Sequence, residues 1–390
     1  MFSREQNTAV RSGRAKRPLY AVSRIHLDSM TSALGVWQHA TGTDPNPRFG
    51  HCTDDVARAI VVDMLHSREL GWEAVEASAA RSLRFMQEAF DHSTGRFLNF
   101  RDADGLWHEA DASEDCHARA LVGLAAVMVE RPGTDMADRA RRLFLLALPA
   151  AAGFDAIRPI SAALIGCDMV ASADLAAEAK PAFDRLAGRL IEKFGDPGEE
   201  WPWPDQVLTY ENALVARGLI TAGRRLGNQP LVARGCAVLD WLIDVQTEGG
   251  IFSPIGNSRW WPRGGKRSRF DQQPIEAATM IDAAAAAFRA TGRRRYVDAA
   301  EMAYGWFLGD NDLGISLANP AGGGCCDGLM PSGVNENQGG ESTLMWLTAL
   351  ETMRELRCAA TGRLDRSAGV QSAPVQSSPT GSSPTPGARA

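Results

Sequence analysis

Residues 212–223 form a segment of helix-forming residues that carries almost no charge. It reads Asn-Ala-Leu-Val-Ala-Arg-Gly-Leu-Ile-Thr-Ala-Gly, and Arg217 is its single charged residue. A helix on the surface of a globular protein normally has a charged face. We therefore expect this helix to be buried on all sides. The polar residues at its start, Asp205, Tyr210, Glu211 and Asn212, would then open onto an enclosed polar site.

The same design recurs along the chain. Six helices are predicted to begin with polar residues and continue as apolar ones, and amphipathic helices are predicted at 74–90, 135–150, 174–194, 229–246 and 294–308. A helix at 20–40 would complete six pairs. The starts of the apolar helices are marked by Asp54, Glu114, Ser161, Glu211, Glu276 and Glu341, spaced 47–65 residues apart.

Six pairs with the apolar helices inside and the amphipathic helices outside predict an all-α (α/α)6 toroid. Short hairpins are expected in its loops, as at 91–112, where Gly95 and Trp107 lie. An array of helix pairs that does not close is the alternative. One toroid would occupy residues 20–360. Residues 1–19 are predicted to be a disordered basic arm, and the Ser-, Pro- and Gly-rich residues 361–390 a disordered tail.

Charge and cysteine content restrict the class of protein. The formal net charge of −6 argues against a nucleic-acid-binding protein. No secretory signal follows Met1 and no run of about 18 apolar residues is present, so no membrane span is expected. The 7 cysteines include no Cys-x-x-Cys pair, which indicates reduced thiols in a cytoplasm. We expect no metal and no cofactor, and the oligomeric state is not predicted.

Carboxylates close to the starts of the apolar helices are the candidate catalytic groups. In a toroid these helix starts converge, and glycoside hydrolysis needs two carboxyl groups beside the scissile bond, one as acid and one as base or nucleophile. Close negative charges raise one pKa, which keeps one carboxyl protonated near neutral pH. Glu211 and Glu276 are predicted to be central, with Asp55 and Asp115 supplying the other acid or base. Asp54 and Glu114 have an alternative role as helix caps.

Aromatic and polar residues of the connecting loops are the candidate substrate-binding groups. Indole rings in loops suit stacking on a pyranose, although packing of the loop onto the core is the alternative. The loop around 259–266 also carries Arg259, Arg263 and Lys266, which would bind an acidic sugar or phosphate, or balance the acids. The residues expected to bind substrate are His51, Asp54, Glu114, His117, Trp201, Trp203, Asp205, Tyr210, Asn212, Trp260, Trp261, Asp271, Gln272, Gln273, Asn337, Gln338 and Glu341.

Six motifs lie at or near the predicted helix starts and in the loops: His51-Cys-Thr-Asp-Asp, Ser113-Glu-Asp-Cys-His-Ala-Arg-Ala, Leu208-Thr-Tyr-Glu-Asn-Ala, Phe252-Ser-Pro-Ile-Gly-Asn, Phe270-Asp-Gln-Gln-Pro-Ile-Glu-Ala and Asn335-Glu-Asn-Gln-Gly-Gly-Glu-Ser-Thr. They resemble the motifs of a bacterial family often labelled glycosyltransferase-like, whose members resemble six-hairpin glycosidases and tend to accompany glycosyltransferases and mannoside phosphorylases. The resemblance covers about residues 45–355 and implies an (α/α)6 fold and carbohydrate chemistry. It assigns no catalytic pair.

The first functional prediction is a glycoside hydrolase acting on an oligo- or polysaccharide that contains mannose or glucose. A transferase is disfavoured because the sequence has no alternating strand–helix pattern and no phosphate site for a nucleotide sugar. A sugar epimerase with paired histidines and a polysaccharide lyase using Tyr210 are alternatives on the same fold. A catalytically silent glycan-binding partner of a glycosyltransferase is the alternative from a different class.

Overall fold

The computed structural model describes residues 16–108, 113–171 and 175–362. Most of the predicted tail at 361–390 and most of the predicted arm at 1–19 lie outside these residues. Within them, six helices form an inner ring: α2 (Thr53–Leu70), α4 (Glu114–Glu130), α6 (Ile157–Ala171), α8 (Asn212–Arg225), α10 (Pro274–Thr291) and α12 (Gly340–Ala360). Each packs on the next, and α12 packs on α2 to close the ring. The closed ring confirms the predicted toroid over the open array.

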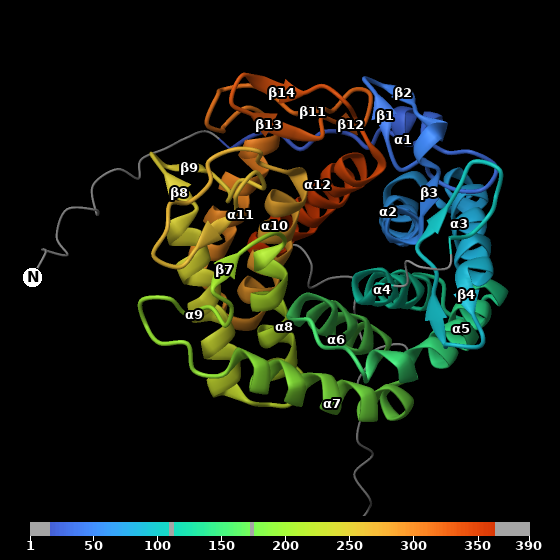
Figure 1. The fold of residues 1–390 in the computed structure, drawn as a ribbon, viewed down its shortest axis with the longest axis horizontal. Coiled ribbons are helices and arrows are strands. Elements are labelled where there is room, and N and C mark those ends of the chain that lie inside the picture. Colours follow the sequence, from blue (N-terminus) through green and yellow to red (C-terminus); the bar gives the residue numbers. More distant parts are fainter. Residues whose placement is uncertain (1–15, 109–112, 172–174, 363–390) are drawn as a thin grey trace, which may run out of the picture.

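Five further helices surround the ring: α3 (Glu76–Ala89), α5 (Asp135–Ala151), α7 (Ala176–Phe194), α9 (Gln229–Val245) and α11 (Arg294–Phe307). Figure 1 shows α3, α5, α7 and α9 outside the inner helices. Side-chain caps mark the starts of α4 and α5, since Ser113 accepts a hydrogen bond from the Cys116 amide and Thr134 accepts one from the Ala137 amide. The amphipathic and apolar patterns therefore separated outer from inner helices correctly.

The predicted helix at 20–40 is wrong. Only α1 (Ile25–Ser29) is helical in that segment. Ser32 ends it, because its hydroxyl accepts hydrogen bonds from the Leu34 and Gly35 amides and builds a turn in place of a further helical turn. Two of the apolar residues that suggested a helix, Leu27 and Met30, are still buried in the core, whereas a third, Ile25, is exposed.

An extended strap, residues 16–24, occupies the place of a twelfth long helix outside the seam between α12 and α2. Arg17 pairs with Asp310 beyond the end of α11 at 2.7 Å. Arg354 and Arg357 of α12 donate hydrogen bonds to the carbonyls of Tyr20 and Arg17. At its other end Arg24 is buried on α2, where it pairs with Asp63. Residues 16–19, predicted to belong to the free arm, are therefore held against the ring.

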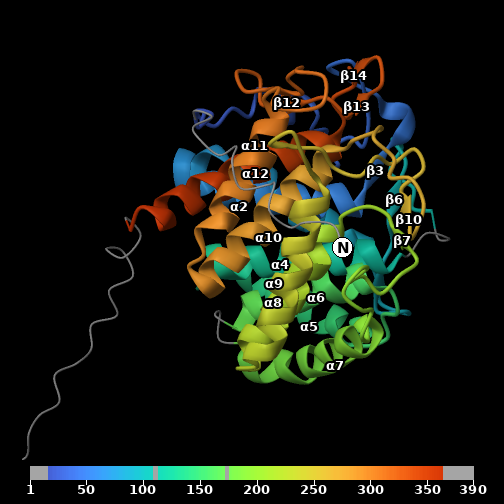
Figure 2. The ribbon, with the colours of Figure 1, turned by 90° about the vertical axis from the view of Figure 1, so that its left-hand side faces the viewer.

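The connecting loops contain short strands. Within the described residues, these strands form seven antiparallel two-stranded sheets. The strands are β1 (Ala40–Thr41) with β2 (Asp44–Pro45), β3 (His51–Cys52) with β6 (Phe100–Arg101), β4 (Phe90–Asp91) with β5 (Arg96–Phe97), β7 (Val207–Leu208) with β10 (Trp261–Pro262), β8 (Thr247–Glu248) with β9 (Ile251–Phe252), β11 (Ala318–Asn319) with β12 (Gly324–Cys325), and β13 (Gly328–Met330) with β14 (Gly333–Asn335). The short 3-10 helices Pro47–Phe49 and Trp72–Ala74 complete the elements. Figure 2 shows β3, β6, β7 and β10 along one edge of the molecule, where the inner helices begin.

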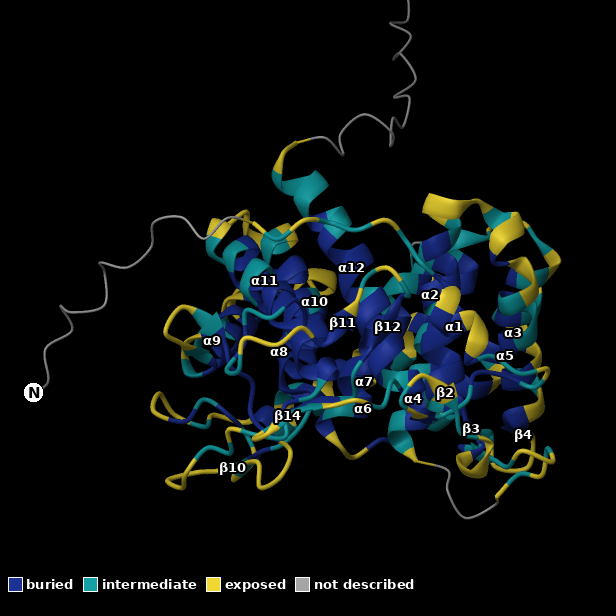
Figure 3. Cartoon of the chain, turned by 90° about the horizontal axis from the view of Figure 1, so that it is seen from above, coloured by how far each residue is buried: buried dark blue, intermediate teal, exposed yellow. Residues whose placement is uncertain are grey.

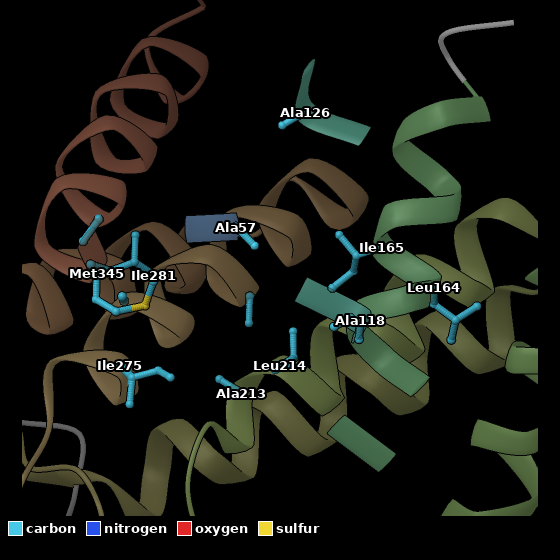
Figure 4. Close-up of a cluster of buried hydrophobic side chains, with 14 of the residues drawn as sticks. Ala57, Ala118, Ala126, Leu164, Ile165, Ala213, Leu214, Ile275, Ile281 and Met345 are labelled. Atoms are coloured by element: carbon cyan, nitrogen blue, oxygen red, sulfur yellow. The ribbon is translucent and has the colours of Figure 1, made fainter. Parts of the chain in front are cut away.

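The centre of the ring is filled by small and branched apolar side chains. Figure 4 shows such residues from all six inner helices, among them Ala57, Ala118, Leu164, Ala213, Ile275 and Met345. Figure 3 shows that buried residues occupy the middle of the molecule and exposed ones its margins. Small residues allow the helices to approach closely, so a Cβ placed on Gly218 of α8 would lie 2.6 Å from the Ser161 hydroxyl oxygen of α6.

Gly218→Ala is expected to destabilise the ring by about 1–3 kcal/mol, because α6 and α8 would have to separate. Thermal unfolding of the variant measures this loss. Gly188→Ala on the outer helix α7 is the matched control, since its Cβ would meet nothing within 4 Å. It should gain about 0.5–1 kcal/mol from the better helix propensity of alanine. Equal melting temperatures for the two variants would contradict close packing of α6 on α8.

Candidate active site

All six inner helices begin at the same end of the ring, because an outer helix or a loop returns the chain after each one. Glu211 immediately precedes α8, and the other carboxylates lie in the first turns of α2, α4, α10 and α12. These residues are Asp54, Asp55, Glu114, Asp115, Glu211, Glu276 and Glu341. The following contacts decide which of them remain available for chemistry.

Glu211 and Glu276 are joined directly. The Glu211 backbone amide donates a hydrogen bond to Oε1 of Glu276. Glu211 has left-handed backbone angles, with φ 52° and ψ 37°, and this bend aims its amide at the neighbouring helix. Glu276 is 5% exposed. Burial raises the pKa of Glu276 to about 8. The negative charge of Glu211 raises this pKa further, whereas the hydrogen bond from the Glu211 amide lowers it. Glu276 therefore holds a proton at neutral pH.

Arg119 of α4 fixes Glu211 as a carboxylate. Its two terminal nitrogens donate to the two Glu211 oxygens at 3.1 and 2.7 Å, and its Nε lies 3.1 Å from Oδ1 of Asp54. Burial alone would raise the pKa of Glu211, but the Arg119 guanidinium outweighs burial and lowers it. Adjacent carboxyl groups thus have opposite protonation states, with Glu276 neutral and Glu211 charged.

A second arginine joins α2 to α12. Arg58 contacts Oδ1 of Asp55 and Oε2 of Glu341, each at 2.8 Å. The Cys52 thiol donates to the other Asp55 oxygen at 3.1 Å. Burial raises the pKa of Asp55 to about 6, against the lowering effect of Arg58. Glu341 is the most exposed carboxylate of this group, with 43% of its side chain accessible.

Asp115 lies on α4, opposite α10 in the order of the six inner helices. The Tyr210 hydroxyl donates to its Oδ2 at 2.9 Å. Burial raises the pKa of Asp115, with Arg119 and the Tyr210 hydrogen bond acting in the opposite direction. Arg158 of α6 supports this arrangement from the face of the tyrosine ring, with its guanidinium carbon 4.7 Å from the ring centroid. Asp115 and Glu276 therefore lie on inner helices that are three places apart in the ring, and both accept a hydrogen bond from the segment Tyr210–Glu211 before α8.

Other predicted site residues have structural contacts. Both Glu114 oxygens accept hydrogen bonds from the Asp155 and Ala156 amides, so Glu114 caps the start of the neighbouring helix α6. The Asn212 side chain is fully buried, accepting from Arg158 and donating to the Thr209 carbonyl. The side chains of Glu114 and Asn212 are therefore engaged in structural hydrogen bonds.

The two predicted histidines belong to the core. His117 is fully buried, with Nε2 hydrogen-bonded to the Ala147 carbonyl of α5 at 3.0 Å. Burial lowers the pKa of His117 to about 4. His51 stacks on Trp37 with ring centroids 4.0 Å apart, and its Nδ1 hydrogen-bonds the Val36 carbonyl. The structure places neither ring beside Glu211 or Glu276.

The predicted glutamines and asparagines separate into two groups. Gln272 is fully buried, accepting from the Trp306 indole and donating to Asp312, so it fixes the loop before α10. Gln273 is half-buried beside Asp271, and its hydrogen bond opposes the burial that raises the pKa of Asp271. Asn337 and Gln338 both hydrogen-bond Gly42 and join the loop before α12 to the loop after β1.

The loop tryptophans also divide. Trp203 is 1% exposed and Trp201 5% exposed, so both fix their loop to the core rather than offering a face. Trp261 and Trp201 pack on Trp241 of α9, with centroids 6.1 and 5.3 Å from it. Trp260 is exposed. Asp205 is exposed as well, and its carbonyl accepts the Trp201 indole hydrogen bond.

Sequence reasoning missed the three arginines at the helix starts, Arg58, Arg119 and Arg158. Arg119 and Arg158 are the single arginines of α4 and α6, and Arg58 is the single cation in the first three turns of α2. A charge in such a position needs a buried partner, so the isolation itself was the available signal. Their partners could not be read from the chain, because Arg119 and Glu211 are 92 residues apart.

Comparisons with known proteins bear on the fold. No protein-family model and no curated protein matches the chain. Similar solved structures include a cellobiose 2-epimerase from Bacillus thermoamylovorans, with a TM-score of 0.68 and 12% identity over 87% of this chain and 96% of that one. A cellobiose 2-epimerase from Spirochaeta thermophila has a TM-score of 0.64 and 14% identity over 83% and 90%. The fold is an (α/α)6 toroid.

A GH76 α-mannanase from Bacteroides thetaiotaomicron is a further similar solved structure, with a TM-score of 0.54 and 9% identity over 79% of this chain and 86% of that one. At these identities the similarity shows the fold alone. The resemblance to the glycosyltransferase-associated family stays a prediction. Across the described parts of the toroid, no helix has the length and apolar character needed to cross a membrane.

Proposed function

We propose that this protein is a glycoside hydrolase in which Glu276 is the general acid. The observation that carries the proposal is the burial of Glu276 at the start of α10 in contact with Glu211, which raises the pKa of Glu276 to about 8. A general acid must hold its proton at the working pH and release it to the leaving oxygen. Glu211, held charged by Arg119 next to Glu276, adds to the retention of that proton.

Asp115 is the proposed general base. It is a half-buried carboxylate on α4, across the ring from Glu276 on α10, and the Tyr210 hydroxyl orients it. In this mechanism Glu276 protonates the glycosidic oxygen while Asp115 takes a proton from a water molecule that attacks the anomeric carbon. The proposed pathway is inverting, because in it Asp115 activates water and does not attack the anomeric carbon itself.

Sugar epimerases share the fold, but the epimerase alternative needs a pair of histidines as acid and base. His51 and His117 are engaged in the core. The carboxylates at the helix starts favour a hydrolase over an epimerase. They also favour a hydrolase over a silent binding partner, because a binding site does not need a buried protonated carboxyl group beside a charged one. A substrate containing mannose or glucose is part of the proposal.

Product release from manno- and gluco-oligosaccharides, followed by NMR of the anomeric protons, tests the proposal. We expect release with inverted configuration, and Asp115→Asn should lower kcat by about 10²–10⁴-fold because the base is lost. Asp135→Asn is the matched control at an exposed carboxylate in the first turn of the outer helix α5, with 83% of its side chain accessible, and should leave kcat unchanged. Exchange of deuterium into C2 of the sugar without bond cleavage would instead show an epimerase, and binding without either reaction would show a silent partner.

A further inference from the structure

The rim loop, residues 257–266, is attached to the candidate active site. Its strand β10 pairs with β7, and Trp261 lies opposite Leu208, two residues before Tyr210. The rim loop therefore lies at the end of the ring where the inner helices begin. Figure 3 shows β10 at the lower margin of the molecule, on the same side as β3 and β14.

Trp260 in the rim loop has a strained backbone. Its φ is 53°, a left-handed value that is unfavourable for a bulky residue. Three hydrogen bonds hold it there: its amide donates to Gly256, its carbonyl accepts from Ser268, and its indole donates to Oδ1 of Asn257 at 2.6 Å. Strain of this kind concentrates at ligand-contacting positions. The fold thus fixes an indole that is 38% exposed.

The position of Trp260 differs from that of the other loop tryptophans. Trp201 and Trp261 pack against each other and against Trp241. Trp260 has no aromatic contact among the residues that the structure describes. Its exposed ring is therefore not needed to fasten the loop to the core, and it is available to stack on a sugar ring.

Three cations share the rim loop with Trp260. Arg259, Arg263 and Lys266 are exposed, and none of them forms an ion pair with another described residue. The base of the same loop is different, because Arg267 pairs with Glu248 at 3.2 Å and Arg269 with Asp312 at 2.7 Å. The site acids are already matched by buried arginines, so the rim-loop charges do not balance them.

We infer that the rim loop is an outer subsite for an acidic polysaccharide. Trp260 stacks on a pyranose ring, and Arg259, Arg263 and Lys266 bind carboxylate, sulfate or phosphate groups of the glycan. This inference rests on the proposed function, since it treats the rim loop as the continuation of the same substrate site. It adds that the substrate is a polymer, long enough to reach from the ring to the rim, and that it is negatively charged.

The test measures binding in the full-length Glu276→Gln protein, which is not expected to degrade its ligand. The probes are polygalacturonate, dextran sulfate, neutral glucomannan and polyglutamate, compared by affinity gel electrophoresis at two salt concentrations. At least one acidic polysaccharide should bind about tenfold more tightly than glucomannan and polyglutamate. Polygalacturonate and dextran sulfate distinguish a carboxylate from a sulfate as the preferred group.

Substitutions locate the binding. Arg259→Gln with Arg263→Gln and Lys266→Gln should abolish the preference for the acidic polysaccharide, and Trp260→Ala should weaken binding about fivefold. The matched control removes the exposed outer-helix charges at Arg142, Arg185 and Arg294, and should change binding less than twofold. Equal binding of polyglutamate, no preference for any acidic polysaccharide, or a preference that survives the rim-loop triple substitution would overturn the inference.

The outcome is separable from that of the proposed function. If the protein with Glu276 intact shows no turnover, the hydrolase proposal is wrong, and the binding comparison still tests the rim loop. If the protein turns over substrate but shows no preference for acidic glycans, the rim-loop inference is wrong and the hydrolase proposal stands.

Discussion

Glu276→Gln is expected to reduce hydrolysis of unactivated oligosaccharides by about 10²–10⁴-fold while the protein remains folded. The glutamine keeps an oxygen that accepts the hydrogen bond from the Glu211 amide, but it cannot protonate the leaving group. Glycosyl fluorides need little protonation of the leaving group, so the variant should retain most of its activity on them. Equal losses on both kinds of substrate would contradict a role as general acid.

The pH dependence follows from the same group. The pKa of Glu276 is about 8 in the folded protein, so kcat/KM of the unsubstituted protein should fall as the pH rises through 8 and the acid loses its proton. Initial rates on an oligosaccharide between pH 5 and 10 measure this limb. With a glycosyl fluoride as substrate the alkaline fall should be weak.

Stability also depends on this carboxyl. The unfolded chain releases the Glu276 proton near its ordinary pKa of 4.5, whereas the folded chain holds it to about pH 8. Folding stability therefore decreases as the pH rises between these values, by an amount on the order of a few kcal/mol, and the loss is absent below pH 4.5. Glu276→Gln should melt at a higher temperature than the unsubstituted protein at pH 8, and not at pH 4.5.

Arg119→Met is expected to destabilise the protein by about 3–5 kcal/mol, because it leaves a buried Glu211 carboxylate without its partner. Glu211 is 3% exposed and cannot recover the lost contact from water. Thermal and urea unfolding measure the effect. The double variant with Glu211→Gln should be more stable than Arg119→Met alone, since the uncompensated charge is then absent.

Arg68→Met is the matched control for Arg119→Met. Arg68 pairs with Glu130 and Glu355 on the surface, and 44% of its side chain is exposed. Its loss should cost about 0–1 kcal/mol. If Arg119→Met costs no more than Arg68→Met, the buried pair does not hold the two inner helices together.

Much of the fold could be predicted because charge marks the environment of a helix. Residues 212–223 lack a charged face, and α8 is buried in the ring as that pattern predicted. The segment 20–40 has apolar residues at helical spacing too, but a side chain–backbone turn at Ser32 competes with the helix. The spacing of apolar residues predicts which residues are buried, whereas local hydrogen bonds determine whether the backbone forms a helix or a turn.

The candidate site could be predicted as a set of residue types and not as a network. Glu276 and Asp115 were recognisable as acids at helix starts, but their protonation depends on burial and on distant partners. Glu114 looked equivalent to Asp115 in the sequence and caps a neighbouring helix instead. Trp203 looked like Trp260 and is buried. Both differences arise from contacts between helices that neighbouring residues in the chain do not encode.

The strap that covers the seam between α12 and α2 has a consequence for biosynthesis. Arg17 leaves the ribosome 293 residues before its partner Asp310, which at about 5–20 residues per second is a delay of roughly 15–60 s. During that interval α2 has no α12 beside it, and the strap lacks its contacts with Asp310 and with α12. Closure of the ring is therefore a late event, and a nascent chain that stalls before α12 leaves that flank open to chaperones and to aggregation.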